Sequence, residues 1–143
     1  MTTSRNEQHA ILATEVQDEN RLDFLPRHFG RHMLKVERSI YDQCANLCPS
    51  YRGGYWHYYD LSNGGCYLAP SCESYSLVHE GNYFDATVSG DAAGIIVSLF
   101  TFSHLSFILE EDPLGHRIAD YFHLLRDFAG SHPEASLIYR AID

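Results

Sequence analysis

The stretch GGYWHYYDLSNGGCYLAP at residues 53–70 contains the clearest structural signal in this sequence. Its aromatic first half leads into Asn63-Gly64, a dipeptide that tolerates the positive φ angles of a tight hairpin turn. A second apolar run, CYLAP, follows the turn. The pattern predicts two antiparallel strands joined by a short hairpin, with Asn63, Gly64 and Gly65 forming the turn.

The aromatic residues of the first strand divide between its two faces. Alternation places Trp56 and Tyr58 on one face and Tyr55, His57 and Tyr59 on the other. One face is expected to pack in the core, and the other to remain a contact surface, because aromatic side chains anchor interfaces and stack on bases. The hairpin residues singled out for a partner-binding role are Tyr55, Trp56, Tyr58, Asp60 and Asn63.

A second strand-turn-strand pattern follows the first. The runs SYSLVHE and YFDATVS are separated around Gly81-Asn82 and alternate as half-buried strands do. They would extend the sheet to about four antiparallel strands, and a meander is the simplest topology.

A helix is expected before the hairpin, from Pro26 to about Leu47. Its apolar stripe recurs at steps of three and four: Phe29, Met33, Val36, Ile40, Cys44 and Leu47. Pro26 suits the first helical turn, and Pro49 ends the run. The opposite face is basic and could contact phosphates or an acidic protein, although such charges usually form only a solvated face. Its residues are Arg27, Arg31, Lys35 and Arg38.

Three further helices are expected after the strands. The first is apolar almost all round, runs from Ala92 to about Leu109 and could be capped by Asp91. The second follows Pro113 and ends at Gly130, and Pro133 begins a last short one. The sequence therefore predicts one compact α+β domain over residues 21–143, with about four helices packed on the antiparallel sheet. Residues 1–20 predict a poorly ordered segment or one short helix.

Composition limits the possible functions. The 143 residues have a formal charge of −9, which argues against a nonspecific nucleic-acid binder, although direct DNA binding is left open. No Lys or Arg lies between Gly53 and His116. The N-terminus lacks the pattern of a secretory signal, and the apolar stretch from Ala92 to Leu109 is too polar for a membrane span. A cytoplasmic protein, monomeric and without membrane contact, is expected.

Catalytic and metal-binding motifs are not found. The chain has no GxSxG, HExxH, Walker or GxGxxG pattern, so no enzymatic activity is expected. Cys44 and Cys48 stand one helical turn apart, with Cys66 and Cys72 further on, but this spacing does not match a zinc knuckle. The cysteines are interpreted as reduced, semi-buried thiols, and no metal or cofactor is predicted.

Several longer motifs occur in fixed order along the chain. They are FLPRHFGRHML at 24–34, GGYW at 53–56, DLSNGGCYLAP at 60–70, VSGDAAGI at 88–95, LRDFAGSHPEA at 125–135 and the terminal IYRAID. In residue type and order the sequence resembles the ArdB/KlcA antirestriction family from about residue 21 to its end.

That resemblance implies a small protein, carried by plasmids or other mobile elements, that alleviates type I restriction-modification of incoming unmodified DNA. It also implies a compact α/β fold, no cofactor, and a type I enzyme or its DNA complex as partner. Mimicry of DNA is not expected, because the acids are scattered and duplex charge density of about one per 1.7 Å needs many more. The alternative is a DNA-associated accessory protein of a mobile element that uses the basic helix face.

Overall fold

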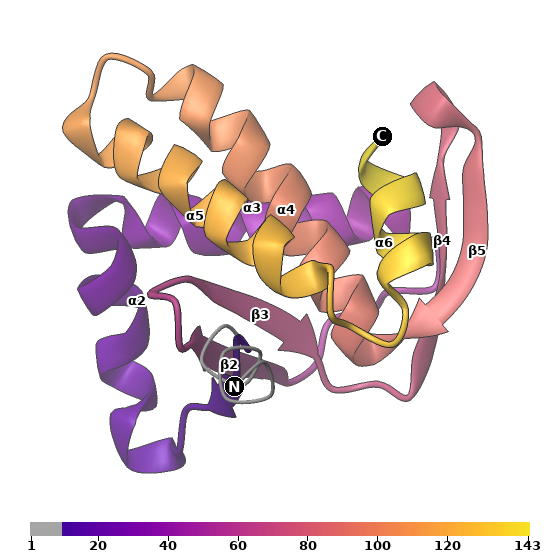
Figure 1. The fold of residues 1–143 in the computed structure, drawn as a ribbon, viewed down its shortest axis with the longest axis horizontal. Coiled ribbons are helices and arrows are strands. Elements are labelled where there is room, and N and C mark those ends of the chain that lie inside the picture. Colours follow the sequence, from indigo (N-terminus) through magenta and orange to yellow (C-terminus); the bar gives the residue numbers. More distant parts are fainter. Residues whose placement is uncertain (1–9) are drawn as a thin grey trace, which may run out of the picture.

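The computed structural model describes residues 10–143, a single α+β domain (Figure 1). The chain runs in the order β1 (Ala13–Glu15), η1 (Asp18–Asn20), α2 (Arg21–Phe29), η2 (Gly30–His32), α3 (Met33–Leu47), β2 (Trp56–Leu61), β3 (Cys66–Pro70), β4 (Ser74–His79), η3 (Glu80–Asn82), β5 (Phe84–Ser89), α4 (Gly90–Ile108), α5 (Pro113–Ala129) and α6 (Ala135–Ile142). The predicted α+β class and both hairpins are confirmed.

The strands form two sheets instead of the one meander that the sequence suggested. In the first, β2 lies between β1 and β3, and in the second β4 pairs only with β5. The connection between β3 and β4 passes against the start of α4, where a Cβ on Gly90 would lie 2.0 Å from the Cys72 carbonyl oxygen. Only glycine fits at this approach, and beyond it the chain enters the second sheet, where β4 pairs with β5.

The N-terminal segment contributes to the first sheet. Ala13 pairs with Leu61 and Glu15 with Tyr59, so β1 extends the hairpin by one strand. Within the segment 1–20, residues 13–15 form β1 and residues 18–20 form the short helix η1, while residues 1–9 lie outside the described residues.

The single helix predicted from Pro26 to Leu47 is two helices, α2 and α3. The four basic residues therefore do not share one helix face as predicted. Gly30 has φ +51°, in the left-handed region, and ends α2 before α3 begins at Met33. Pro26 lies inside α2 instead of in its first turn, because α2 begins at Arg21. The prediction failed because periodicity records which face is buried, and a single glycine can redirect the axis without disturbing that pattern.

The core is organised around α4, which contacts α3, α5 and β3 (Figure 1). It is long and apolar enough to cross a membrane, but most of it is buried inside the protein. Ser89 caps the N-terminus of α4 by accepting a 3.0 Å hydrogen bond from the Ala92 amide. The predicted cap, Asp91, is instead the second residue of the helix. Gly130 ends α5 as predicted, and Ile138 of α6 is fully buried.

Candidate functional site

Strand β2 presents two different faces, as its alternation predicts. Trp56 is 3% exposed and donates a hydrogen bond from Nε1 to the Tyr51 hydroxyl, and Tyr58 is buried against Phe24 with ring centroids 4.7 Å apart. Both side chains therefore belong to the core and are buried from solvent. The accessible face of the strand presents Tyr55, which is 50% exposed, together with His57 and Tyr59.

Arg21 fixes the aromatic start of this strand. Its guanidinium lies 4.5 Å from the Tyr55 ring centroid and 4.1 Å from that of Tyr58, and Nη2 donates to the Trp56 carbonyl at 2.9 Å. A cation between two aromatic rings is held by their electron-rich faces. Tyr55 is thus positioned by a packed cation although half of it faces solvent.

Tyr59 leads from this face to a buried polar network. It pairs across the strands with Tyr67, and the two rings stack with centroids 4.7 Å apart. The Tyr67 hydroxyl donates a 2.7 Å hydrogen bond to Oδ1 of Asp91, and His132 lies 2.8 Å from Oδ2 through Nε2. The network joins β3, the first turn of α4 and the loop before α6.

The Asp91 carboxyl is held in its ionised form. Burial disfavours its charge, but the hydrogen bonds from His132 and Tyr67 outweigh burial and lower the pKa of Asp91 below its ordinary value. Burial, with the nearby Asp91 charge, raises the pKa of Tyr67, so this hydroxyl remains a donor. None of these groups was predicted as a site residue, although Asp91 was predicted as a helix cap and both Asp91 and His132 lie within the motifs at 88–95 and 125–135.

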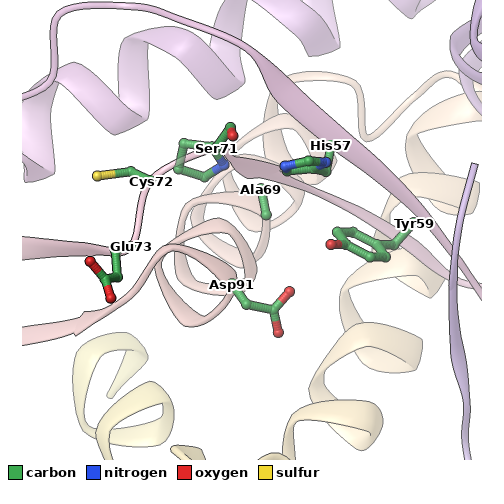
Figure 2. A pocket seen from close by; sticks show the side chains of 8 residues that line it. His57, Tyr59, Ala69, Ser71, Cys72, Glu73 and Asp91 are labelled. Atoms are coloured by element: carbon green, nitrogen blue, oxygen red, sulfur yellow. The ribbon is translucent and has the colours of Figure 1, made fainter. Parts of the chain in front are cut away.

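A hollow of about 360 Å³ opens beside this network (Figure 2). We call it the sheet-face hollow, and its lining residues are His57, Tyr59, Ala69, Pro70, Ser71, Cys72, Glu73 and Asp91. The His57 ring is fixed by a 2.7 Å contact from Nδ1 to Oε2 of Glu15. In Figure 2 the Cys72 sulfur points away from the His57 ring, and it contacts the Ser74 carbonyl. The arrangement offers rings and carboxylates for binding and does not pair a nucleophile with a base.

Asp60, predicted as a partner-binding residue, forms an internal cluster with α2. Arg27 approaches its two oxygens at 3.0 and 3.4 Å, and His28 Nε2 lies 2.6 Å from Oδ1. The other nitrogen of His28 contacts the Tyr121 hydroxyl of α5 at 2.9 Å. Burial opposes the Asp60 charge, but His28 and Arg27 outweigh burial and lower the pKa of Asp60. His28 was not among the predicted site residues, although it lies in the motif at 24–34.

The four predicted basic residues separate into two pairs. Arg27 is held by Asp60, and Arg31 by Asp112 at the start of α5. Lys35 and Arg38 lie on α3 and line a hollow of about 690 Å³ with Leu34, Glu37, Tyr41 and Asp42. The basic pair therefore lies among acidic neighbours and does not form a continuous cationic stripe.

Residues Asn63, Gly64 and Gly65 connect β2 to β3 and also contact the helix layer. Gly64 has φ +95°, and the Gly65 amide donates to Oδ1 of Asn63 at 3.0 Å. Nδ2 of Asn63 donates to the Leu124 carbonyl in α5 at 3.0 Å. The turn is thereby attached to the helix layer, which makes Asn63 a positioning residue for the hairpin.

The cysteines do not form a metal site within residues 10–143. No group of three or more His, Cys, Asp or Glu side chains in that range is arranged to hold a metal ion. Cys44, Cys48 and Cys66 are buried, and Cys72 is exposed. Burial raises the pKa of the Cys44 thiol to about 12.

Comparison with known proteins assigns the family. Residues 49–143 match the family described as Antirestriction protein. The antirestriction protein KlcA of Escherichia coli is 44% identical over 93% of this chain and 95% of its own length. The uncharacterised protein YfjX of Escherichia coli K12 is 36% identical over 93% of this chain and 88% of its own length. A solved structure of the KlcA and ArdB proteins, described as a novel fold, superposes with a TM-score of 0.87 at 43% identity over 93% of this chain and 95% of that one. The chain belongs to the antirestriction protein family.

Proposed function

We propose that this protein alleviates type I restriction-modification of incoming unmodified DNA, and that it acts by binding instead of catalysis. The observation that carries the proposal is the likeness to KlcA and ArdB over almost the whole chain, since those proteins are described as active against type I DNA restriction systems in vivo but not in vitro. We further propose that the protein works in the cytoplasm as a monomer and is carried by plasmids or other mobile elements.

The partner in this proposal is a type I enzyme or its complex with DNA, and the contact surface is the outward face of β2. Tyr55, His57 and Tyr59 present ring surface beside the sheet-face hollow. Aromatic side chains of low conformational freedom are the usual anchors of protein interfaces. Arg21 and Glu15 hold two of the three rings, so little ordering entropy is lost on binding.

The pairing of the acids supports an action other than DNA mimicry. A phosphate-like row needs free carboxylates at regular spacing, about one charge per 1.7 Å of duplex. In this chain Asp60 is paired with Arg27, Asp112 with Arg31, Asp91 with His132 and Glu15 with His57. These contacts engage four of the nineteen acids, and the other acids are spread along the sequence instead of forming one continuous row.

The relatives' activity in vivo but not in vitro supports a target that exists only in the cell. An enzyme translocating on DNA, or a host component acting with it, has that property, whereas a purified resting enzyme does not. We therefore place the point of interference in the working complex.

The experiment is plating of unmodified phage on cells that carry a type I system, with modified phage as control. The wild-type protein should restore plating of unmodified phage alone, and the double variant Tyr55→Ser/His57→Ser should lose at least about tenfold of that effect, as expected for interface anchors. Leu22→Ser is the matched control, because Leu22 is 94% exposed in α2 and lies outside this face. No restoration by the wild type sinks the proposed function, whereas an active double variant removes only the contact surface.

A further inference from the structure

The tip of the β4–β5 hairpin holds a residue in an unfavourable backbone conformation. Tyr83 has φ +60° and ψ +21°, and it is the only non-glycine residue with positive φ in residues 10–143. An aromatic residue is disfavoured in the left-handed region because its Cβ crowds the backbone. The Tyr83 side chain is nevertheless 92% exposed, so no packing inside the protein compensates for the conformation.

The neighbouring Asn82 holds this conformation in place. Its Oδ1 accepts from the Phe84 amide and from His79, both at 3.1 Å, and its Nδ2 donates to the Ala141 carbonyl at 2.7 Å. The tip is therefore tied to its own hairpin and to the end of α6, so that Tyr83 projects from a fixed base. Backbone strain at a residue whose side chain is exposed is a reason to look for a function.

Two hollows flank the tip of this hairpin, and the Tyr83 ring lines one of them. One of about 410 Å³ includes Tyr83 and Asp85 in its lining, and the other, of about 540 Å³, lies toward the end of α3. Val78, His79 and Glu80 line both hollows, and Val78 is partly exposed on the outer face. A projecting ring next to concave surface is the shape of an interface anchor with room for the partner's side chains. Figure 1 shows that this hairpin lies away from the β2–β3 hairpin that carries the sheet-face hollow.

The charges around the tip limit the kind of partner. Glu80 and Asp85 flank Tyr83 and are exposed, and no Lys or Arg lies between residues 53 and 116. The nearby cation, Arg140, lies over the Phe84 ring with 5.7 Å to its centroid. A complementary surface therefore has basic side chains around an apolar pocket.

We propose that Tyr83 anchors a second protein contact, in which its ring enters an apolar pocket with a basic rim on the partner. A second copy of this chain fits poorly, because a protein with a formal charge of −9 would place like charges together. The inference rests on the proposed function for its readout, and it adds a contact separate from the outward face of β2.

The test exploits the unusual backbone of Tyr83. Tyr83→Gly removes the ring and relieves the left-handed conformation, so its melting temperature should equal or exceed that of the wild type. The same variant should lose at least about tenfold of the restriction alleviation in the plating assay, because truncated anchors weaken binding strongly. Tyr83→Phe keeps the ring and should keep the activity. Tyr83→Asn, which also tolerates positive φ, should repeat the loss if Tyr83→Gly expresses poorly.

The outcomes separate this contact from the proposed function. A stable, inactive Tyr83→Gly with an active Tyr83→Phe supports the contact, and loss of alleviation in Glu80→Lys/Asp85→Lys supports the basic rim. A fully active Tyr83→Gly overturns the contact and leaves the proposed function standing. A wild-type protein that restores no plating removes the proposed function, and the Tyr83 contact is lost with it.

Discussion

The side-chain amide of Asn63 donates a 3.0 Å hydrogen bond to the backbone carbonyl of Leu124, which joins the β2–β3 turn to the middle of α5. Asn63→Ala removes this bond and the bond from Gly65, and should lower the free energy of unfolding by about 1–3 kcal/mol. Urea denaturation measures the loss. Asn46→Ala, at an exposed position of α3, is the control and should change stability little. Equal stability of both variants contradicts an anchoring role for Asn63.

Gly94 is where α4 approaches β3 most closely. A Cβ at this position would lie 2.4 Å from the Cα atom of Ala69 and 2.5 Å from the Leu68 carbonyl oxygen. Gly94→Ala should therefore destabilise the protein by about 1–3 kcal/mol or more, although alanine favours helices. Thermal unfolding measures it against His104→Ala on the exposed side of the same helix. A Gly94→Ala variant as stable as the wild type would show that the two backbones can separate freely.

His28 predicts a specific pH dependence. Burial lowers its pKa below 6.5 despite the Asp60 carboxylate, so the folded protein keeps the ring neutral where the unfolded chain binds a proton. The contribution of His28 to the free energy of unfolding should then be complete above pH 6.5. It should be lost as the pH drops from 6.5 toward the folded pKa of His28. Denaturant unfolding between pH 7.5 and about 5 measures this slope. His28→Gln should flatten it, and an unchanged slope rejects His28 as its source.

Thiol chemistry should distinguish Cys72 from the other cysteines. Cys72 is exposed, whereas Cys44, Cys48 and Cys66 are buried and burial raises the pKa of Cys44 and Cys66. A thiol reagent added to the native protein should modify one cysteine per chain rapidly, because thiolate character and access control the rate. Cys72→Ser should remove that fast reaction. Rapid modification of further thiols before unfolding contradicts the packed core around α4.

Lys35 and Arg38 test the DNA-associated alternative. With Arg27 and Arg31 held by carboxylates, the remaining pair should bind duplex DNA weakly, with a dissociation constant above about 10⁻⁴ M at physiological salt. Fluorescence anisotropy at low and high salt measures the affinity. Tight, salt-dependent binding that Lys35→Glu/Arg38→Glu abolishes supports the accessory function instead.

Local patterns predicted much of this fold. Alternation separated the faces of β2, because side chains on a strand point to opposite sides whatever surrounds them. Two features depend on the backbone at a glycine and were missed. Gly30, with its positive φ, divides the predicted helix, and Gly90 lies close to Cys72 where the chain passes from the first sheet to the second. Neither event changes the hydrophobic periodicity from which the elements were read.

The site was predicted less completely than the fold. Periodicity separated Trp56 and Tyr58 from Tyr55 but did not say which face is buried, and the buried Trp56 and Tyr58 were predicted as partner-binding residues together with Tyr55. The Tyr67–Asp91–His132 network joins residues far apart in the sequence, and single-chain patterns do not record such pairings. Arg27 and Arg31 were interpreted as part of one exposed basic face, open to a partner or to solvent, because their partners within the chain, Asp60 and Asp112, lie more than 30 residues away.

The burial of β3 gives the two strands of the hairpin different freedom to vary. All five residues of Cys66–Pro70 are buried, so almost any change there must repack the core. Tyr55 and His57 reach solvent, so substitutions there disturb the core little, whereas Tyr59 also stacks on the buried Tyr67 ring. In the contact surface proposed above, positions 55 and 57 can thus vary while the adjacent strand preserves the fold.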